Sequence, residues 1–242
     1  MKKLFGLTIL LTGCLNNNQD CIPGQDLDSD GLNDCVELQI GTDMNLSDSD
    51  DDGFTDAEEL DCISDPLSSD EICYTCGWEH NAPDTLLSTG KEEGDVIDNL
   101  LLHDQCGDTV SLWDFHGKYN LLYMTVGWCN GCNREAANLQ SVQEDFAAET
   151  GLDFQFLLVL YENDSGYPAA PEDSISYAES IGNPIFPVFA DGNDTVVDAT
   201  PLTNNARPEM CALSPDLEII KCYTGYDGYA NALADIKIHA GL

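Results

Sequence analysis

Residues 120–135 read Asn-Leu-Leu-Tyr-Met-Thr-Val-Gly-Trp-Cys-Asn-Gly-Cys-Asn-Arg-Glu, and this stretch decides the fold. The apolar run 120–126 predicts a buried strand, and a helix-competent segment follows it. Cys129 therefore falls at a strand-to-helix turn, where free backbone N–H groups and the helix dipole stabilise a thiolate. A second cysteine, Cys132, follows at the spacing of a thiol–disulfide exchanger. We interpret Cys129 as the attacking thiolate and Cys132 as the resolving thiol.

Two other roles are open to a Cys-X-X-Cys pair: a purely structural disulfide and half of a zinc site. Zinc would require two more Cys or His ligands at a suitable spacing, and none stands out in the sequence. The strand before Cys129 and the helix after Cys132 favour redox chemistry. Cys73 and Cys76 share the spacing without a preceding strand, so we interpret them as two half-disulfides between an N-terminal segment and the next domain.

The chain around this stretch alternates strands and helices. Strands are expected at 96–102, 120–126, 154–161 and 185–190, with a hairpin at 210–214 and 218–223; helices are expected at 130–150, 174–181 and 229–240. This order predicts a mixed α/β sheet covered by helices. Cys211 and Cys222 fall on the two arms of the hairpin and can form a cross-strand disulfide, and Cys76 can pair with Cys106. The connectivity as a whole is not deducible.

The net charge and the number of cysteines limit which partners the protein can bind and in which compartment it works. The formal net charge is −37, and no Lys or Arg occurs between Leu4 and Gly90. Binding of nucleic acid is excluded as a function, because phosphate contacts need a basic surface. The 11 cysteines indicate an oxidising compartment outside the cytoplasm.

The acidic segment contains two 12-residue windows, 26–37 and 48–59, in register at a spacing of 22 residues. Each has carboxylates at positions 1, 3, 5, 9 and 12, glycine at position 6 and an apolar residue at position 7, which is the pattern of a calcium loop. The predicted ligands are Asp26, Asp28, Asp30, the Leu32 carbonyl, Asp34 and Glu37 in the first loop, and Asp48, Asp50, Asp52, the Phe54 carbonyl, Asp56 and Glu59 in the second. The alternative is a solvated acidic linker.

With their Gly-Thr-Asp and Ser-Asp-Pro turns at 41–43 and 64–66, the loops resemble the bacterial thrombospondin type 3 repeat over residues 24–70. An EF-hand would need a longer incoming helix, and the Gly-Thr-Asp turn argues against a dockerin. The resemblance implies a stalk made rigid by about two structural Ca²⁺ ions. Without calcium we expect it to be disordered, because it has few apolar residues to bury.

The N-terminus reads as a targeting segment. Lys2 and Lys3 precede a short apolar run and the sequence Leu-Thr-Gly-Cys at 11–14, and the run is too short to span a bilayer. The segment resembles a bacterial lipoprotein signal, which implies cleavage before Cys14 and attachment to the membrane by a lipid on its sulfur. An ordinary signal peptide with a chance cysteine is the alternative.

Residues from about 77 to 242 resemble the extracytoplasmic thioredoxin-like proteins of the TlpA/ResA and AhpC/TSA redoxin group. Four motifs carry the resemblance: Asn-Ala-Pro-Asp at 81–84, Val-Ser-Leu-Trp-Asp-Phe-His-Gly-Lys at 110–118, Trp-Cys-X-X-Cys-X-X-Glu at 128–135, and Arg-Pro at 207–208. The resemblance implies a thioredoxin-like fold that needs no organic cofactor and a client protein with a disulfide or dithiol. It also implies that Pro208 is a cis-proline facing the disulfide and that Glu135 tunes the thiols.

Two departures from related families matter. Thioredoxin has a buried Asp in the strand before its motif, and the corresponding residue here is Tyr123, which puts a thioredoxin-like proton relay in doubt. Peroxiredoxins place a Thr two or three residues before their reactive Cys in a Pro-rich loop. Thr125 lies four residues before Cys129 and no such proline precedes it, so peroxidase activity is the weaker interpretation.

The only two arginines, Arg134 and Arg207, lie next to the redox motif and the predicted cis-proline. In so acidic a chain the overall field raises a thiol pKa, and a nearby guanidinium opposes it. We hypothesise that Arg207 stabilises the Cys129 thiolate; a solvated arginine is the alternative.

The sequence thus predicts a signal peptide (1–13), a lipidated tether (14–23), a calcium stalk (24–73) and a thioredoxin-like domain (77–242). The predicted function is thiol–disulfide exchange in a bacterial cell envelope, facing the periplasm or the exterior. The rival hypothesis is a surface calcium-binding or adhesion lipoprotein whose thioredoxin-like domain only binds a partner.

Overall fold

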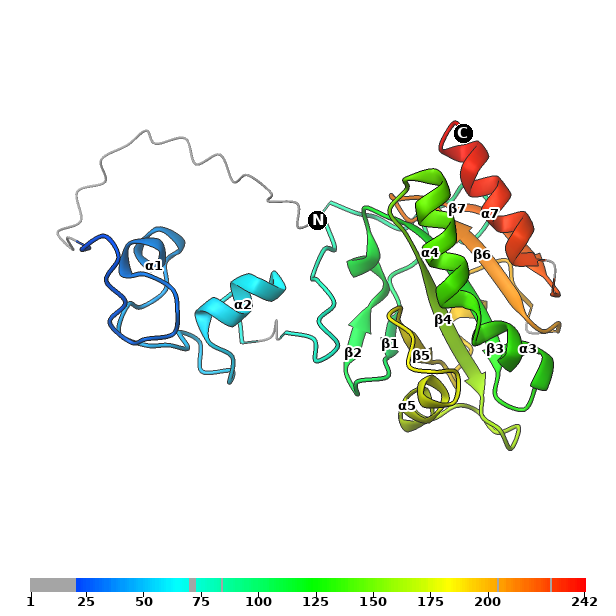
Figure 1. Cartoon of the computed structure of the whole chain (residues 1–242), viewed down its shortest axis with the longest axis horizontal. Helices are drawn as coiled ribbons and strands as arrows, with labels where there is room; N and C mark the ends of the chain where they lie inside the picture. Colours follow the sequence, from blue (N-terminus) through cyan, green and yellow to red (C-terminus); the bar gives the residue numbers. More distant parts are fainter. Residues whose placement is uncertain (1–20, 70–72, 84, 204, 227) are drawn as a thin grey trace.

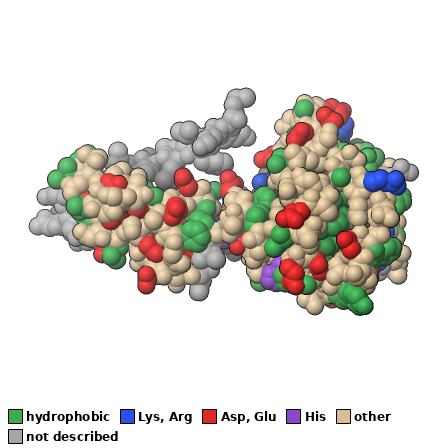
Figure 2. Space-filling view, turned by 60° about the horizontal axis from the view of Figure 1, so that its bottom comes forward, with side chains coloured by type: hydrophobic (Ala, Val, Ile, Leu, Met, Phe, Trp, Pro, Cys, Tyr) green, Lys and Arg blue, Asp and Glu red, His purple; other side chains and the backbone are tan. Residues whose placement is uncertain are grey.

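The computed structural model describes residues 21–69, 73–83, 85–203, 205–226 and 228–242. The repeat segment (residues 21–69) has two short helices, and the sheet domain (residues 73–242) has a central sheet with helices around it (Figure 1). The signal segment and Cys14 lie outside the described residues. Acidic side chains are scattered over the visible face of both parts, and few Lys and Arg side chains appear there (Figure 2).

Each loop of the repeat segment leads into one short helix. Helix α1 spans Asp34–Ile40 and is capped by Asn33, whose side chain accepts from two backbone N–H groups. Helix α2 spans Asp56–Cys62 and begins with a capping box formed by Thr55 and Glu58. The residues that these two helices bury are all acidic, in contrast to an ordinary amphipathic helix.

Seven strands form one mixed sheet in the order β2-β1-β5-β4-β3-β6-β7. Their bounds are β1 Leu101–His103, β2 Thr109–Ser111, β3 Tyr119–Val126, β4 Phe154–Glu162, β5 Val188–Ala190, β6 Glu209–Leu213 and β7 Ile219–Thr224. Strand β3 is central, parallel to β4 and antiparallel to β6. This sheet confirms the predicted mixed α/β fold and the predicted terminal hairpin of β6 and β7.

Helices cover the sheet on both faces (Figure 1). They are η1 Leu112–Phe115, α3 Asn130–Ala136, α4 Leu139–Thr150, α5 Pro171–Ser180, α6 Thr195–Asp198 and α7 Gly228–His239. Along β3, Leu121 and Tyr123 join the core cluster that includes residues of α4, α5 and α7, whereas Leu122 and Met124 join the one that includes residues of η1 and α6. This alternation is the two-residue period of a strand buried on both faces.

Two predicted elements differ from the structure. The single helix expected at 130–150 is divided between α3 and α4, because the Asn138 amide donates to the carbonyl of Arg134 and its backbone N–H donates to that of Glu135. Such local bonds compete with the helical pattern. The strand expected at 96–102 is reduced to β1, and Val96 makes only an isolated bridge to Glu218.

All ten described cysteines are paired. The disulfides are Cys21–Cys35, Cys62–Cys73, Cys76–Cys106, Cys129–Cys132 and Cys211–Cys222. The predicted Cys76–Cys106 and Cys211–Cys222 pairs are confirmed, and Cys73 and Cys76 are indeed two half-disulfides. Among the described residues, the Cys62–Cys73 disulfide is the one that links the repeat segment to the sheet domain, at its first described residue. No helix in this described part of the chain is long and apolar enough to cross a membrane.

Replacing both Cys211 and Cys222 by alanine should lower the free energy of unfolding by about 2–4 kcal/mol, because their disulfide restricts the unfolded chain. Urea unfolding followed by circular dichroism measures this loss. The control is the double replacement of Cys129 and Cys132 by alanine, which opens a much shorter loop (sequence separation 3 instead of 11) and should cost less. Equal losses in the two variants would contradict the prediction.

Candidate active site

The Cys129–Cys132 disulfide lies at the turn between β3 and α3. Strand β3 ends at Val126, and Cys129 is the N-cap of α3, with its Sγ accepting a hydrogen bond of 3.2 Å from the backbone N–H of Cys132. Cys129 is partly exposed, whereas Cys132 is fully buried. An attacking thiol can therefore reach Cys129 Sγ but not Cys132 Sγ.

Asn133 fixes the start of α3 to its surroundings. Its Nδ2 donates to the carbonyl of Gly127 over 2.6 Å, and its Oδ1 accepts from the hydroxyl of the buried Tyr177 of α5 over 3.0 Å. Gly127 itself is tightly enclosed, because a Cβ there would lie 2.4 Å from Oδ1 of Asp164. The turn that carries the disulfide is thus held by β3, α5 and the loop after β4.

Two exposed aromatic residues border the disulfide. Trp128 is 49% exposed, and its Nε1 donates to Glu162 of β4 over 2.6 Å. Tyr226 is 53% exposed, and its hydroxyl oxygen lies 3.7 Å from Cys129 Sγ. The sequence did not single out Tyr226 because it is 97 residues away from Cys129 and lies in a loop. Its proximity depends on the pairing of β3, β6 and β7.

Tyrosines form the buried layer beneath the disulfide. Tyr123 is fully buried. Burial is the main cause that raises its pKa, and the nearby charge of Glu135 raises it further. Burial likewise raises the pKa of Tyr177 to about 12. Both phenols therefore remain neutral at physiological pH. That Tyr123 replaces the buried Asp of thioredoxin stays a prediction; a neutral phenol does not accept a proton as a carboxylate would.

The Arg207–Pro208 peptide bond is cis, the isomer that the resemblance implies. The Arg207 guanidinium lies over the ring of Tyr161, 4.4 Å from its centroid, and Nη1 donates to the carbonyl of Ala206. Burial lowers the pKa of Arg207, and the charge of Glu209 opposes this shift. These contacts place Arg207 against Tyr161, and its effect on Cys129 stays a prediction. Arg134 is exposed on α3.

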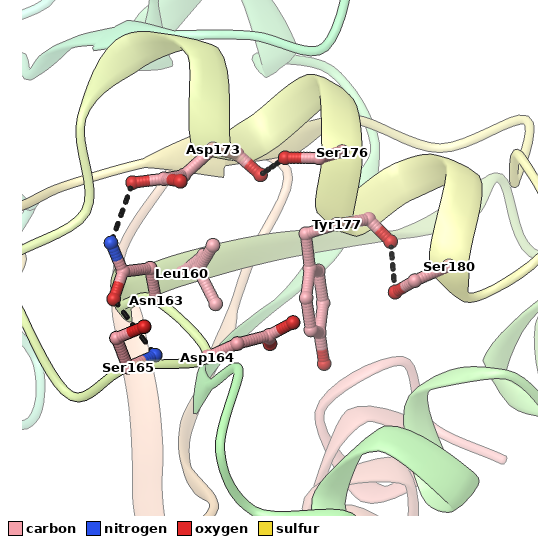
Figure 3. Close-up of a pocket in the computed structure, with 8 residues that line it drawn as sticks. All are labelled: Leu160, Asn163, Asp164, Ser165, Asp173, Ser176, Tyr177 and Ser180. Atoms are coloured by element: carbon pink, nitrogen blue, oxygen red, sulfur yellow. Dashed lines mark hydrogen bonds between the residues drawn. The ribbon is translucent and has the colours of Figure 1, made fainter.

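A polar cavity of about 160 Å³ lies between α5 and the loop after β4 (Figure 3). It is lined by Leu160, Asn163, Asp164, Ser165, Asp173, Ser176, Tyr177 and Ser180. Asp173 accepts from the N–H of Ala170 at the start of α5 and from the amide of Asn163. The cavity shares Asp164 and Tyr177 with the contacts that hold the redox turn.

The repeat segment brings the first three predicted ligands of each loop together. In both Asp26–Asp28–Asp30 and Asp48–Asp50–Asp52, one carboxylate oxygen from each residue lies within 4.8 Å of the others. The glycines at position 6, Gly31 and Gly53, have φ of 105° and 106°, the left-handed conformation that a sharp loop requires.

The glutamates at position 12 are buried without full hydrogen bonding. Glu37 and Glu59 are fully buried, and both oxygens of Glu37 and Oε2 of Glu59 have no hydrogen-bond partner among the described residues. Burial, followed by repulsion from Asp28, raises the pKa of Glu37 to about 7. Burial raises that of Glu59 to about 7 as well, although a bond from Ser64 opposes the shift. A divalent cation would bind the carboxylate oxygens that have no hydrogen-bond donor and would compensate their negative charge. The set of donor oxygens therefore fits calcium.

The aspartates at position 9 hold the loops themselves. Asp34 accepts from the N–H of Leu27, and Asp56 accepts from the N–H and hydroxyl of Ser49. The two loops also touch, since Asp30 Oδ2 accepts from the N–H of Ala57 over 3.2 Å. Direct coordination by Asp34, Asp56 and the carbonyls of Leu32 and Phe54 remains a prediction.

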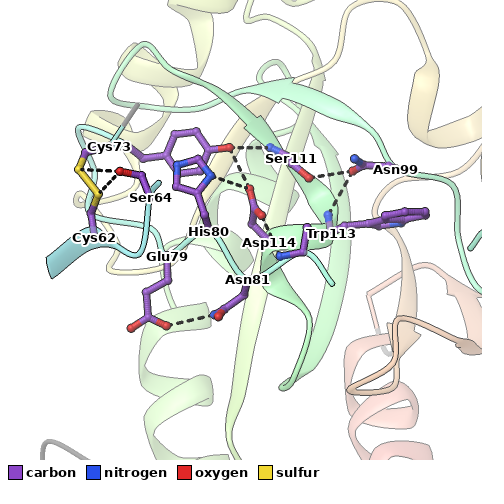
Figure 4. Close-up of polar contacts among 12 residues, drawn as sticks. Cys62, Ser64, Cys73, Glu79, His80, Asn81, Asn99, Ser111, Trp113 and Asp114 are labelled. Atoms are coloured by element: carbon purple, nitrogen blue, oxygen red, sulfur yellow. Dashed lines mark hydrogen bonds and ion pairs between the residues drawn. A yellow bond between two sulfur atoms is a disulfide. The ribbon is translucent and has the colours of Figure 1, made fainter. Parts of the chain in front are cut away.

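The second loop connects to the sheet domain through a chain of contacts (Figure 4). The hydroxyl of Ser64 donates to Glu59 and lies beside the Cys62–Cys73 disulfide. The next residue, Tyr74, donates to Asp114 of η1 over 2.9 Å, and its ring stacks on His80 with centroids 4.2 Å apart. The last turn of the repeats is therefore fixed directly to the sheet domain.

Comparison with known families identifies both parts. Residues 93–220, more than half of the 242-residue chain, match the AhpC/TSA family, and residues 26–43 and 48–69 match the bacterial TSP3 repeat. The chain belongs to the AhpC/TSA family. Its sheet domain is an oxidoreductase of the thioredoxin-like class, preceded by TSP3 repeats.

The comparison with solved structures found proteins similar to this AhpC/TSA domain. Peroxidoxin BcpB from Mycobacterium tuberculosis is 15% identical, with 61% of this chain and 97% of that chain covered and a TM-score of 0.50. A putative thioredoxin from Neisseria meningitidis is 24% identical, with 63% and 92% covered and a TM-score of 0.48. The exposed lipoprotein thioredoxin Etrx1 from Streptococcus pneumoniae is 18% identical, with 57% and 99% covered and a TM-score of 0.46. The comparison with curated proteins found no match.

Replacing Asn133 by alanine should destabilise the AhpC/TSA domain by about 1–3 kcal/mol, because it leaves the buried Tyr177 hydroxyl without its acceptor. Urea unfolding measures the change. The control is Asn130→Ala, an exposed asparagine in the same turn of α3, which should alter stability by no more than about 0.5 kcal/mol. Equal midpoints for the two variants would refute the anchoring role of Asn133.

Proposed function

We propose that this AhpC/TSA protein is an envelope thiol–disulfide oxidoreductase that acts through Cys129 and Cys132, is anchored by lipid on Cys14 and stands on a calcium-stiffened stalk at 24–73. The observation that carries the redox part is the contrast between the two sulfurs. Cys129 is a partly exposed residue at the N-cap of α3, and its disulfide partner Cys132 is fully buried. Attack is thereby restricted to one sulfur.

In the reduced protein, the Cys129 thiolate attacks one sulfur of a client disulfide. A mixed disulfide forms between Cys129 and the client, and the other client sulfur leaves as a thiolate that takes up a proton. Cys132 then loses its proton and attacks Cys129 Sγ, which reforms the internal disulfide and releases the second client thiolate. Two electrons pass from the protein to the client; the reverse sequence oxidises a client dithiol.

The geometry supports disulfide exchange over peroxide reduction. Thr125 is fully buried in β3 and lies four residues before Cys129, whereas peroxiredoxins place their Thr two or three residues before the reactive Cys. This spacing favours disulfide exchange. The cis bond before Pro208 is consistent with the cis-proline facing the disulfide that the resemblance implies.

Calcium binding by the stalk is supported by what its helices bury. Helices α1 and α2 bury Asp34, Glu37, Asp56 and Glu59, and no apolar residue among the seven of either helix is fully covered. Two bound cations would neutralise these groups, with Glu37 offering both of its carboxylate oxygens and Glu59 its unpartnered Oε2.

An envelope location is supported by the cysteines. Ten of the 11 form disulfides, as is typical of an oxidising compartment, and the remaining one is Cys14 of the predicted lipid-attachment sequence. The client is a protein with an accessible disulfide or dithiol.

Replacing Cys129 by serine should abolish the reduction of insulin disulfides by the full chain with dithiothreitol as the reductant, because serine forms no mixed disulfide. Turbidity of the insulin B chain measures the rate. Cys132→Ser should instead accumulate the mixed disulfide, visible by mass spectrometry. If Cys129→Ser and the wild type reduced insulin equally fast, the adhesion hypothesis would be favoured.

Replacing Glu59 by glutamine should remove one of two calcium ions per chain, or weaken its binding more than about tenfold. The substitution replaces a charged carboxylate ligand by a neutral amide, and loss of a group that only orients a ligand already costs about tenfold or more in metal affinity. Isothermal titration calorimetry of the full chain measures both quantities. The control is Asp61→Asn, which removes the same charge from an exposed residue of α2 and should leave both ions bound. Absence of calcium binding by the wild type would contradict the calcium stalk.

A further inference from the structure

The contact between Tyr226 and the redox motif has no part in the exchange steps above. The Tyr226 hydroxyl oxygen lies 3.7 Å from Cys129 Sγ, within range of a hydrogen bond to sulfur. A disulfide sulfur carries no proton, so the tyrosine hydroxyl is the donor. Tyr226 lies in the loop between β7 and α7, whereas Trp128, next to Cys129 in the sequence, is held by Glu162 of β4.

Gly131 provides a second, independent observation. It lies inside α3 and is not among the glycines with positive φ, so its backbone conformation does not require glycine. Alanine would favour the helix by about 1 kcal/mol. A Cβ at Gly131, however, would lie 2.2 Å from the hydroxyl oxygen of Tyr226 and 2.9 Å from its Cζ. The phenol of Tyr226 thus packs directly on Gly131 of the Cys-X-X-Cys motif, where no side chain is present.

We propose that Tyr226 is a further catalytic residue whose hydroxyl donates a hydrogen bond to the Cys129 thiolate. The absence of a side chain at Gly131 leaves the room that this position of the hydroxyl requires. The proposal deepens the proposed disulfide exchange and rests on it. When the disulfide is reduced, Cys129 Sγ gains a negative charge, and a hydrogen bond to a charged acceptor is stronger than one to a neutral sulfur. Tyr226 therefore stabilises the attacking form of Cys129 more than the oxidised form.

Other groups around Cys129 set the background for this effect. The titratable side chains on the surrounding elements include Glu135 and Arg134 of α3, Tyr123 of β3, Glu162 of β4, Asp164 of the following loop, Tyr177 of α5 and Arg207 before β6. The carboxylates oppose a thiolate, whereas the guanidinium groups and the backbone N–H of Cys132 favour it. The tyrosine hydroxyl adds a second donor that is already in contact with the sulfur.

The test is the pH dependence of alkylation of Cys129 by iodoacetamide in the full chain. Cys14 and Cys132 are replaced by serine in every variant, so that Cys129 is the single free thiol and the other disulfides stay intact. Tyr226→Phe should raise the pKa of Cys129 by about one unit, a tenfold smaller acid dissociation constant. Tyr167→Phe, another exposed tyrosine near Trp128, is the matched control and should leave the pKa unchanged.

Gly131→Ala separates the hydroxyl from its placement. This variant retains Tyr226 but displaces its ring, so the pKa of Cys129 should rise as in Tyr226→Phe, and the two changes together should raise it no further than either alone. An unchanged pKa in a folded Tyr226→Phe variant overturns the proposal, and so do fully additive shifts. Failure of the wild type to reduce insulin would refute the proposed exchange but leave the measured pKa shift in place, so the two failures are distinguishable.

Discussion

The central constraint is the burial of β3 on both faces. Its residues from Asn120 to Val126 are buried, and it pairs with β4 on one side and β6 on the other, so its register cannot slip without exposing apolar side chains. The end of the strand, and with it the position of Cys129, is therefore fixed by the core. Asn133 then fixes the start of α3 from the opposite side of the turn. The turn that carries Cys129 is thus positioned by the buried strand on one side and by the contacts of Asn133 on the other.

The two parts of the chain are stabilised by different physics. The sheet domain buries large apolar side chains such as Phe156, Phe186 and Phe189. The repeat segment buries Glu37 and Glu59 instead, and it contains the Cys21–Cys35 disulfide. Under the proposed calcium binding, the cations compensate this buried negative charge, and the order of the segment follows the calcium concentration. The Cys62–Cys73 disulfide joins the two where they meet, and the bond of the next residue, Tyr74, to Asp114 fixes this junction to η1.

Sequence patterns predicted what depends on local periodicity and spacing. The buried strand before Cys129, the hairpin that carries Cys211 and Cys222, and the clustering of Asp26, Asp28 and Asp30 all follow from residues close in sequence. The break at Asn138 was missed, because it depends on side-chain bonds that compete with a helical pattern. Tyr226 was missed for a different reason: its approach to Cys129 exists only after three strands have paired. Contacts of this kind leave no periodic trace in the sequence.

The net charge of −37 acts on the redox site mainly from a distance, and distance decides its effect. Charges separated by more than about 8 Å are largely screened at physiological ionic strength. The backbone N–H of Cys132 at 3.2 Å and the hydroxyl of Tyr226 at 3.7 Å are much closer to Cys129 Sγ, and ions do not come between them and the sulfur. Two neutral donors can therefore outweigh many remote carboxylates in setting the thiol pKa.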